Sequence, residues 1–251
     1  MNTHTVFGIH AATAALKNDP SRVQAIFLSN ERKDNRIKSL EALAVESGIA
    51  TEPLTRREMD RRFGDVRHQG VVVECQVREP LSEPEMLRLL TDLPHPALVL
   101  ALDGVTDPHN LGALLRTADA AGVDCVIAPR NASAGITPVV RKVASGAAEC
   151  VPFCQVANLA RSLAELKSLG LWLYGAAASD EAVAYQSVDY SGAVCLVMGA
   201  EGAGLRRLTK QACDELISLP MAGYVDSLNV SVATGVCLYE VVRQRNIQQS
   251  V

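Results

Sequence analysis

The stretch LISLPMAGYVDSLNVSVATGVCLYE, residues 216–240, decides the fold of the C-terminal part of this chain. Its first four residues predict a short apolar strand, which Pro220 ends because proline has no N–H to donate to a sheet ladder. A polar, glycine-containing turn follows over residues 221–226, and a helix is predicted after it. A strand, a tight loop and a helix in this order are typical of ligand sites in α/β proteins.

The predicted helix has one apolar face, because its apolar residues are spaced four, three and three apart. These residues are Val232, Val236, Tyr239 and Val242. Either Ser227 or Asn229 can cap the first turn. Free backbone N–H groups at a helix start suit a carboxylate or a phosphate. The same residues also fit an ordinary strand–turn–helix connection that binds nothing.

The composition points to a globular protein with a full core, since 48% of the 251 residues are hydrophobic. A net charge of −4 argues against a protein that coats nucleic acid by charge alone, but it allows a local basic face. The N-terminus lacks a basic region followed by a long apolar run, and no apolar stretch is long enough to span a bilayer. We therefore expect a cytoplasmic protein with no membrane partner.

The seven cysteines are odd in number and lie mostly in apolar runs, as expected of reduced, buried thiols in a cytosolic protein. Cys150 and Cys154 are four residues apart, but no second Cys or His pair accompanies them. Because a structural zinc site needs four ligands, we expect no metal.

The chain is expected to divide into a small α/β domain at residues 1–77, a linker at 78–97 and a larger α/β domain at 98–251. The linker has four prolines, which interrupt any long element, and is predicted to hold one short helix at Glu83–Leu90. In the larger domain apolar strands alternate with helices. This alternation predicts a mostly parallel sheet covered by helices on both faces.

The expected elements follow the apolar pattern of each domain. In the small domain, helices are expected at residues 8–16, 36–47 and 56–63, and strands at 23–28, 49–53 and 70–77. In the larger domain, strands are expected at residues 97–102, 124–128, 150–153, 171–176, 194–198 and 216–219. Its helices are expected at residues 111–121, 137–147, 159–169 and 205–212, with a final helix after residue 229.

Five arginines concentrate positive charge in the small domain: Arg56, Arg57, Arg61, Arg62 and Arg67. This cluster fits contact with RNA phosphates. It also fits a solvent-exposed helix face on which Glu58 and Asp60 pair with the arginines.

Two further loops follow predicted strands and are rich in polar residues and glycine. In the loop that starts at Asp103, Asn110 can cap the next helix and Gly112 permits close approach of another backbone. Arg116 lies on the same apolar helix, where it fits either an anionic partner or a surface or interface position. The loop at residues 198–206 has the spacing GxxGxG, which is not the dinucleotide fingerprint. Its Glu201 can cap the following helix or hold a catalytic group.

Together, DGVTDPHNLGALLRTADAAG, LVMGAEGAGLRRLT and the opening stretch resemble, in this order, the three motifs of the SpoU (TrmH) family of RNA ribose 2′-O-methyltransferases. This resemblance covers residues 98–245. The stretches FGIHAATAAL and HQGVVVE are similar to the L30e-like RNA-binding domain at the start of many members. Within the family, the chain looks most like the enzymes that methylate a guanosine ribose in 23S ribosomal RNA of the large ribosomal subunit.

The resemblance implies a SPOUT-type domain with a C-terminal trefoil knot, a homodimer, and S-adenosylmethionine as the cofactor. The catalytic set that it implies consists of Asn110, Arg116, Glu201, Ser227 and Asn229. The cofactor contacts that it implies are Gly199, Leu219 and Leu228, with Met198, Ala200, Pro220 and Met221 nearby. The resemblance implies that an arginine at the position of Arg116 helps to deprotonate the ribose hydroxyl. Our hypothesis is that Arg116 holds the phosphate beside the target ribose, from one protomer or across the dimer interface.

Three other functions stay open at this point. An RNA-binding or ribosome-assembly factor with an inactive cofactor pocket is disfavoured by the intact Arg116, Glu201 and Asn229. A family member with a tRNA substrate is disfavoured by the separate N-terminal domain. A nicotinamide-dependent oxidoreductase would need GxGxxG after the first strand, and this chain lacks it there.

Overall fold

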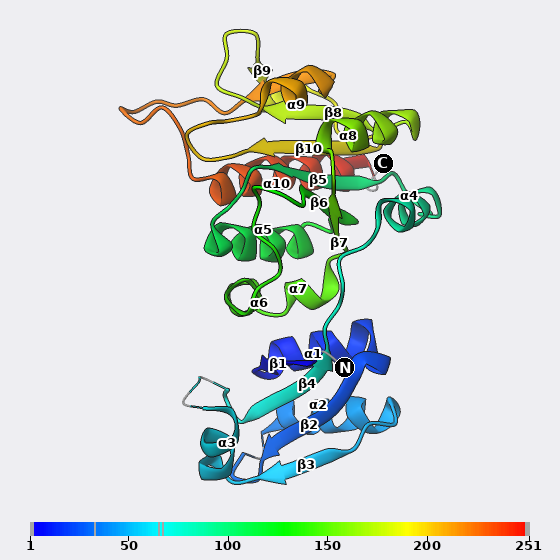
Figure 1. Ribbon diagram of the computed structural model, residues 1–251, viewed down its shortest axis with the longest axis vertical. Helices are drawn as coiled ribbons and strands as arrows, with labels where there is room; N and C mark the ends of the chain where they lie inside the picture. Colours follow the sequence, from blue (N-terminus) through cyan, green and yellow to red (C-terminus); the bar gives the residue numbers. More distant parts are fainter. Residues whose placement is uncertain (1–2, 33, 65, 67, 249–251) are drawn as a thin grey trace. The chain divides into compact units, whose positions relative to one another are not determined.

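The computed structural model describes residues 3–32, 34–64, 66 and 68–248, and the chain divides into two compact units (Figure 1). Unit 1 comprises Met1–Glu79 and Ser145–Cys150, and unit 2 comprises Pro80–Ala144 and Val151–Val251. Both units are α/β, as the sequence predicts.

Unit 1 is built on a four-stranded sheet with the strand order β1-β4-β2-β3. The strands are β1 (Thr3–Phe7), β2 (Val23–Ser29), β3 (Thr51–Leu54) and β4 (Val71–Gln76); β4 is antiparallel to β1 and β2, and β3 is parallel to β2. The helices are α1 (Ile9–Asn18), α2 (Asn35–Glu46), α3 (Arg56–Phe63) and α7 (Ala147–Cys150), with a 3-10 turn at Pro20–Arg22. Strand β1 was not expected from the sequence.

Alternation along β4 explains how this sheet is covered on both faces. Val71 and Val73 belong to the core that contains the buried residues of α1 and α2. Val72 points the other way and packs with Phe27 of β2 and Met59 of α3. Helix α3 begins where Thr55 and Glu58 form a capping box, which satisfies N–H groups at its start.

Unit 2 contains a seven-stranded sheet with the order β7-β6-β5-β10-β8-β11-β9, in which every pairing is parallel. The strands are β5 (Leu98–Asp103), β6 (Cys125–Pro129), β7 (Phe153–Val156), β8 (Trp172–Ala176), β9 (Val183–Ala184), β10 (Val194–Gly199) and β11 (Glu215–Ser218). The helices are α4 (Glu83–Thr91), α5 (Pro108–Ala120), α6 (Pro138–Ala144), α8 (Leu159–Ser168), α9 (Arg207–Ala212) and α10 (Val230–Gln248), with a 3-10 turn at Tyr185–Ser187. This architecture confirms the predicted parallel sheet, and α4 confirms the short helix predicted near residue 83.

Helices cover both faces of this sheet. Val99 and Ala101 of β5 face the core formed with α4 and α8. The intervening residue, Leu100, is fully buried on the opposite face, where α5 and α10 pack beside each other (Figure 1). Gly112 of α5 permits close packing with α6, because a Cβ there would lie 2.6 Å from the Val143 Cβ. The predicted close approach at this glycine is therefore confirmed.

Three expected elements are wrong in their bounds by three residues, and the first is the helix expected at residues 111–121, which begins at Pro108. The helix predicted at residues 137–147 ends at Ala144, because Ser145 and Gly146 have φ of 54° and 103°, which an α-helix cannot contain. The strand predicted at residues 150–153 begins only at Phe153, since Cys150 is the last residue of α7. Strand β9 was not expected, because two residues show no alternation.

Helix α10 is apolar on two sides. Val230, Cys237, Leu238 and Val241 are buried against unit 2. Three of the four residues of the predicted apolar face are exposed instead: Val232, Val236 and Tyr239. Near the end of α10, Arg245 Nη2 donates to the carbonyl oxygens of Gly192 and Ala97, at 2.8 and 3.0 Å. These bonds fix the helix to the chain before β5 and β10, and burial lowers the pKa of this guanidinium.

Within the described ranges, no helix combines the length and the apolar character needed to cross a membrane. Five of the seven cysteines are buried, as the sequence predicts. Burial raises the pKa of the Cys213 and Cys237 thiols to about 12. The trefoil knot stays a prediction.

Candidate active site

Three loops leave the carboxyl edge of the parallel sheet in unit 2. They follow β5 at Asp103, β10 at Gly199 and β11 at Ser218. Asp103 and Gly199 are direct partners in the register of β5 and β10, so the first two loops start side by side. Ligands of open α/β sheets bind at this edge.

Asn229 connects all three loops. Its Nδ2 donates to Asn110 Oδ1 at 3.0 Å and lies 3.5 Å from Glu201 Oε2. Its Oδ1 accepts the backbone N–H of Ser231 at 2.9 Å and therefore caps α10. The amide is thus oriented from both ends. Three of the five predicted catalytic residues come together here from segments far apart in the sequence.

Two of these residues do not act as the helix caps that the sequence suggested. Helix α5 begins at Pro108, and the carboxylate of Asp107 accepts the His109 N–H at 2.9 Å, so Asp107 is the cap. Asn110 lies inside the first turn and faces Asn229 instead. Glu201 lies several residues before α9, and in the described structure no side chain accepts a capping hydrogen bond from the first-turn N–H groups of that helix. Its carboxylate is free to face Asn229.

Ser227 and Arg116 lie outside this cluster. The Ser227 hydroxyl is 3.3 Å from Asp226 Oδ1 and is exposed. Arg116 is exposed on α5, and the described part of the chain offers it no hydrogen bond or ion pair. An unpaired guanidinium one and a half turns beyond Asn110 is suited to an anion that comes from outside this unit.

The glycine loop after β10 is a closed turn. Ala200 and Gly204 exchange two backbone hydrogen bonds, at 3.2 and 2.9 Å, which leave residues 201–203 as its tip. Gly202 and Gly204 have φ of 77° and 64°, which favours glycine. A Cβ on Gly199 would lie 2.2 Å from the Gly204 carbonyl carbon. The space that a side chain at position 199 would need is therefore occupied by the loop itself.

The predicted cofactor contacts occupy the ends of β10 and β11 and the loops that follow. Met198 is buried, whereas Gly199, Ala200, Leu219 and Met221 are partly exposed. Pro220 and Leu228 are exposed. Accessible apolar side chains beside main-chain groups suit a purine base, because the base can stack on the first and bond to the second. These apolar side chains and main-chain groups therefore fit the adenine of S-adenosylmethionine.

The SpoU rRNA Methylase family matches residues 97–239 of this chain, which include the three loops. The family described as RNA 2'-O ribose methyltransferase substrate binding matches residues 5–81. This chain belongs to the SpoU rRNA methylase family.

Several relatives of the family are similar over nearly the whole chain. The 23S rRNA (guanosine-2'-O-)-methyltransferase RlmB of Pseudomonas putida is 52% identical, with 97% of this chain and 98% of the relative covered. The protein of the same name from Coxiella burnetii is 48% identical, with 96% of each chain covered. Each match therefore extends over nearly the full length of both chains.

Solved structures of the family show the same fold. The AdoMet-bound rRNA methyltransferase of Sinorhizobium meliloti has a TM-score of 0.73 and 26% identity, with 96% of this chain and 87% of that chain covered. The SpoU methyltransferase AviRb of Streptomyces viridochromogenes, solved with AdoMet, has a TM-score of 0.77 at 20% identity, with 98% and 92% covered. The second likeness concerns the fold alone.

The arginines of α3 in this SpoU protein are not equivalent. The Arg62 guanidinium carbon lies 4.1 Å from the Phe27 ring centroid, and its nitrogens lie 3.7 Å from Glu52 and Glu74. Arg62 is therefore engaged within unit 1. Arg56, Arg57 and Arg61 are exposed, and Arg67 lies outside the described residues. The chemistry of Arg62 could not be read from the sequence, because Phe27 is far from it in the chain.

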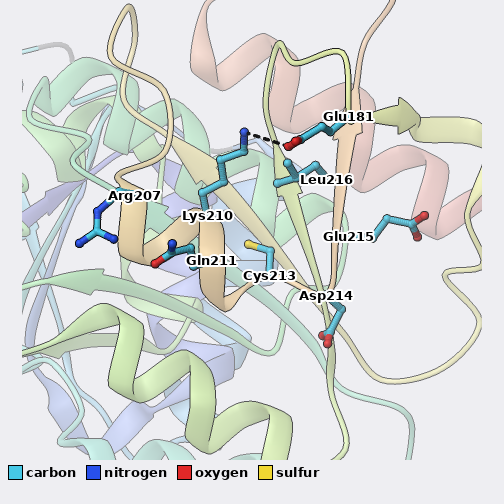
Figure 2. Close-up of a pocket in the computed structure, with 8 residues that line it drawn as sticks. All are labelled: Glu181, Arg207, Lys210, Gln211, Cys213, Asp214, Glu215 and Leu216. Carbon is cyan, nitrogen blue, oxygen red and sulfur yellow. Dashed lines mark ion pairs between the residues drawn. The ribbon is translucent and has the colours of Figure 1, made fainter.

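A cavity of about 550 Å³ lies at the amino end of β11, beside α9 (Figure 2). Its charged lining includes Lys210, whose Nζ lies 3.6 Å from Glu181 Oε2. None of the predicted site residues lines this cavity. Since the loops of the SpoU motifs leave the opposite, carboxyl edge of the sheet, we do not assign the cavity to methyl transfer.

Asp103 is a site residue that sequence reasoning did not single out. It is 1% exposed, and its Oδ2 accepts the backbone N–H of Arg206 at 2.8 Å. The available signal was an acid at the end of the apolar run LVLALD, where a buried strand reaches the sheet edge.

Proposed function

We propose that this chain transfers a methyl group from S-adenosylmethionine to the ribose 2′-hydroxyl of a guanosine in 23S ribosomal RNA. The observation that carries the proposal is the near-complete match, at about half identity, to relatives named for this reaction. The meeting of Asn110, Glu201 and Asn229 at the sheet edge supports it, because three sequence motifs converge on one point there.

The cofactor would lie against the main chain of Gly199 and beside Leu219 and Leu228. When bound, S-adenosylmethionine supplies an electrophilic methyl group on a sulfonium ion. The protein must hold the ribose hydroxyl in line with that methyl group and assist departure of the hydroxyl proton. Asn110 and Asn229 would orient the reacting groups, and Ser227 and Glu201 would shape the pocket.

Arg116 would hold the phosphate beside the target ribose. Its exposed, unpaired guanidinium supports this role, because an Arg can bind phosphate through two N–H groups. A guanidinium stays protonated, so we assign it positioning and charge stabilisation rather than removal of the hydroxyl proton. The Arg116→Ala variant should bind RNA and cofactor but methylate poorly. Full methylation by that variant would contradict the assignment.

Unit 1 would be an L30e-like RNA-binding domain that presents Arg56, Arg57 and Arg61 to rRNA phosphates. A double Arg57→Glu and Arg61→Glu variant is expected to lose rRNA affinity and to keep its affinity for S-adenosylmethionine. Because both side chains are exposed, its unfolding temperature should not change. Filter binding at several salt concentrations measures the effect, and an unchanged affinity would contradict this role. We place the reaction in the cytoplasm.

The functional form would be a homodimer that uses the exposed apolar face of α10. This face consists of Val232, Val236 and Tyr239, which are 53%, 36% and 53% exposed. A Val236→Glu variant is expected to sediment as a monomer. Val45→Glu is the matched control, because Val45 is 75% exposed on α2 of unit 1. Equal sedimentation of both variants and the wild type would contradict this interface.

The direct test of the proposed function is incubation with S-adenosylmethionine and 23S rRNA that lacks the modification. Mass spectrometry should then find a 2′-O-methylguanosine. A chain that binds rRNA but neither binds S-adenosylmethionine by calorimetry nor methylates would be an assembly factor instead.

A further inference from the structure

The two oxygens of the buried Asp103 carboxylate have different environments. Oδ2 accepts the Arg206 N–H at 2.8 Å. Among the described residues Oδ1 has no hydrogen-bond partner, and the Arg206 Nε lies 3.7 Å from it. A buried carboxylate oxygen without a donor is unfavourable, so its place in the structure needs a physical reason.

Asp103 holds the glycine loop, residues 199–206, at both of its ends. Gly199, where the loop begins, is the register partner of Asp103 in the sheet. Arg206, where the loop ends, donates its backbone N–H to the Asp103 carboxylate. Between these points the bridge of Ala200 and Gly204 closes the turn. The loop is therefore held to β5 at its start by strand pairing and at its end by the Asp103 side chain.

The tip of this loop carries Glu201, which lies 3.5 Å from the Asn229 Nδ2. A displacement of the loop would change this separation directly, because Glu201 lies in the loop tip and Asn229 lies outside the loop. It would also move the main chain of Gly199 and Ala200, which the cofactor is expected to contact.

We propose that Asp103 is a positioning residue for methyl transfer, which acts through the Arg206 N–H to set the place of Gly199, Ala200 and Glu201. This inference rests on the proposed function. The negative charge of Asp103 strengthens its bond to the Arg206 N–H, because a hydrogen bond to an ionised acceptor is roughly twice as strong as a neutral one. The Arg206 guanidinium beside Oδ1 gives the carboxylate a counter-charge at the surface.

The test compares three single variants with the wild type. Asp103→Ala removes the acceptor, and Asp103→Asn keeps the side-chain volume and one acceptor oxygen but removes the charge. Asp124→Asn is the matched control, since Asp124 accepts the Leu98 N–H at 2.7 Å at the opposite end of β5. Calorimetry with S-adenosylmethionine, steady-state methylation of rRNA and thermal unfolding are measured for each.

We expect Asp103→Ala to weaken cofactor binding about 10-fold and to lower kcat about 100-fold, as misplacement of reacting groups by ~1 Å does. Asp103→Asn should have a cofactor affinity and a kcat between those of Asp103→Ala and the wild type. This variant tests the inference even if Asp103→Ala does not fold. The KM for rRNA should stay within about twofold in both, because Asp103 is buried away from RNA. Asp124→Asn should lower the unfolding temperature without changing kcat.

A second pair of variants isolates the N–H group. Arg206 has φ of −63°, which proline adopts, so Arg206→Pro removes the donor and keeps the backbone conformation. Arg206→Ala removes the same side chain and keeps the donor. Arg206→Pro should lose more activity than Arg206→Ala, and adding Asp103→Ala to Arg206→Pro should cause little further loss.

Two results would overturn the inference. One is an Asp103→Asn variant whose cofactor affinity and kcat both stay within twofold of the wild type. The other is an equal loss of kcat in Asp124→Asn at the same decrease in unfolding temperature, which would make the effect one of stability. A wild-type protein that binds S-adenosylmethionine but does not methylate rRNA would instead contradict the proposed function, and the binding data on Asp103 would still be decisive for the loop.

Discussion

Replacing Gly199 by alanine tests whether the glycine loop has to fold back closely on the end of β10. An ideal Cβ at this position would lie 2.2 Å from the Gly204 carbonyl carbon and 2.5 Å from the Leu205 nitrogen. Both neighbours are backbone atoms, so rotation of a side chain cannot relieve the clash. Ordinary van der Waals contact begins at 3.4 Å. The loop segment at Gly204 and Leu205 must therefore move by about 1 Å to accept the methyl group.

This displacement predicts a functional loss larger than the loss of stability. Overpacking of this kind costs typically about 1–3 kcal/mol of unfolding free energy. A shift of ~1 Å in a group that positions substrate can cost on the order of 100-fold in rate. We expect Gly199→Ala to remain folded, to bind S-adenosylmethionine about 10-fold more weakly, and to lose about 100-fold in kcat/KM.

Gly192→Ala is the matched control for this experiment. It introduces the same methyl group just before β10 rather than at its end, and nothing lies within 4 Å of an ideal Cβ there. Calorimetry measures cofactor affinity, tritium transfer from labelled S-adenosylmethionine measures activity, and thermal unfolding measures stability. Gly192→Ala should match the wild type in all three. A Gly199→Ala variant with wild-type cofactor affinity would refute the close packing of this loop or its place beside the cofactor.

Asn229→Asp keeps the oxygen that caps α10 but loses the amide donor. The unfolding free energy should therefore change by less than about 1 kcal/mol while kcat falls about 100-fold. A parallel loss of unfolding free energy and kcat would show that the residue has only a structural role. Arg62→Ala should lower the unfolding free energy by about 1 kcal/mol, because it removes the cation–π contact with Phe27, whereas Arg61→Ala should not. The Cys237 thiol has its pKa raised to about 12 by burial, so Ellman's reagent at pH 8 should modify it only after unfolding, and rapid native-state labelling would contradict its burial.

Local sequence patterns identified most of the fold because apolar alternation and helix spacing are read from near neighbours. The strands β5, β6, β8, β10 and β11 and their parallel direction follow from such patterns, whereas their order in the sheet was not predicted. The break between α6 and α7 did not, because Ser145 takes a left-handed φ that the tertiary structure imposes. Strand β9 has only two residues, which is too short for any periodic signal.

The candidate site could be predicted in its composition but not in its internal contacts. Asn110 and Glu201 each looked like helix caps, because capping is judged from the next few residues. The structure shows both beside Asn229, which is 119 and 28 residues away along the chain. Asp103 was missed because its role depends on the Arg206 N–H, 103 residues further on. Pairings at such distances are set by the topology of the sheet.

We propose that this SpoU family member methylates a guanosine ribose of 23S rRNA. The most direct measurement is mass-spectrometric mapping of ribose methyl groups in rRNA from a deletion strain, before and after incubation with the purified protein and S-adenosylmethionine. One guanosine of 23S rRNA should gain a 2′-O-methyl group with the wild type and not with Arg116→Ala. A methyl group on a base, on tRNA, or on no RNA at all would contradict this proposal.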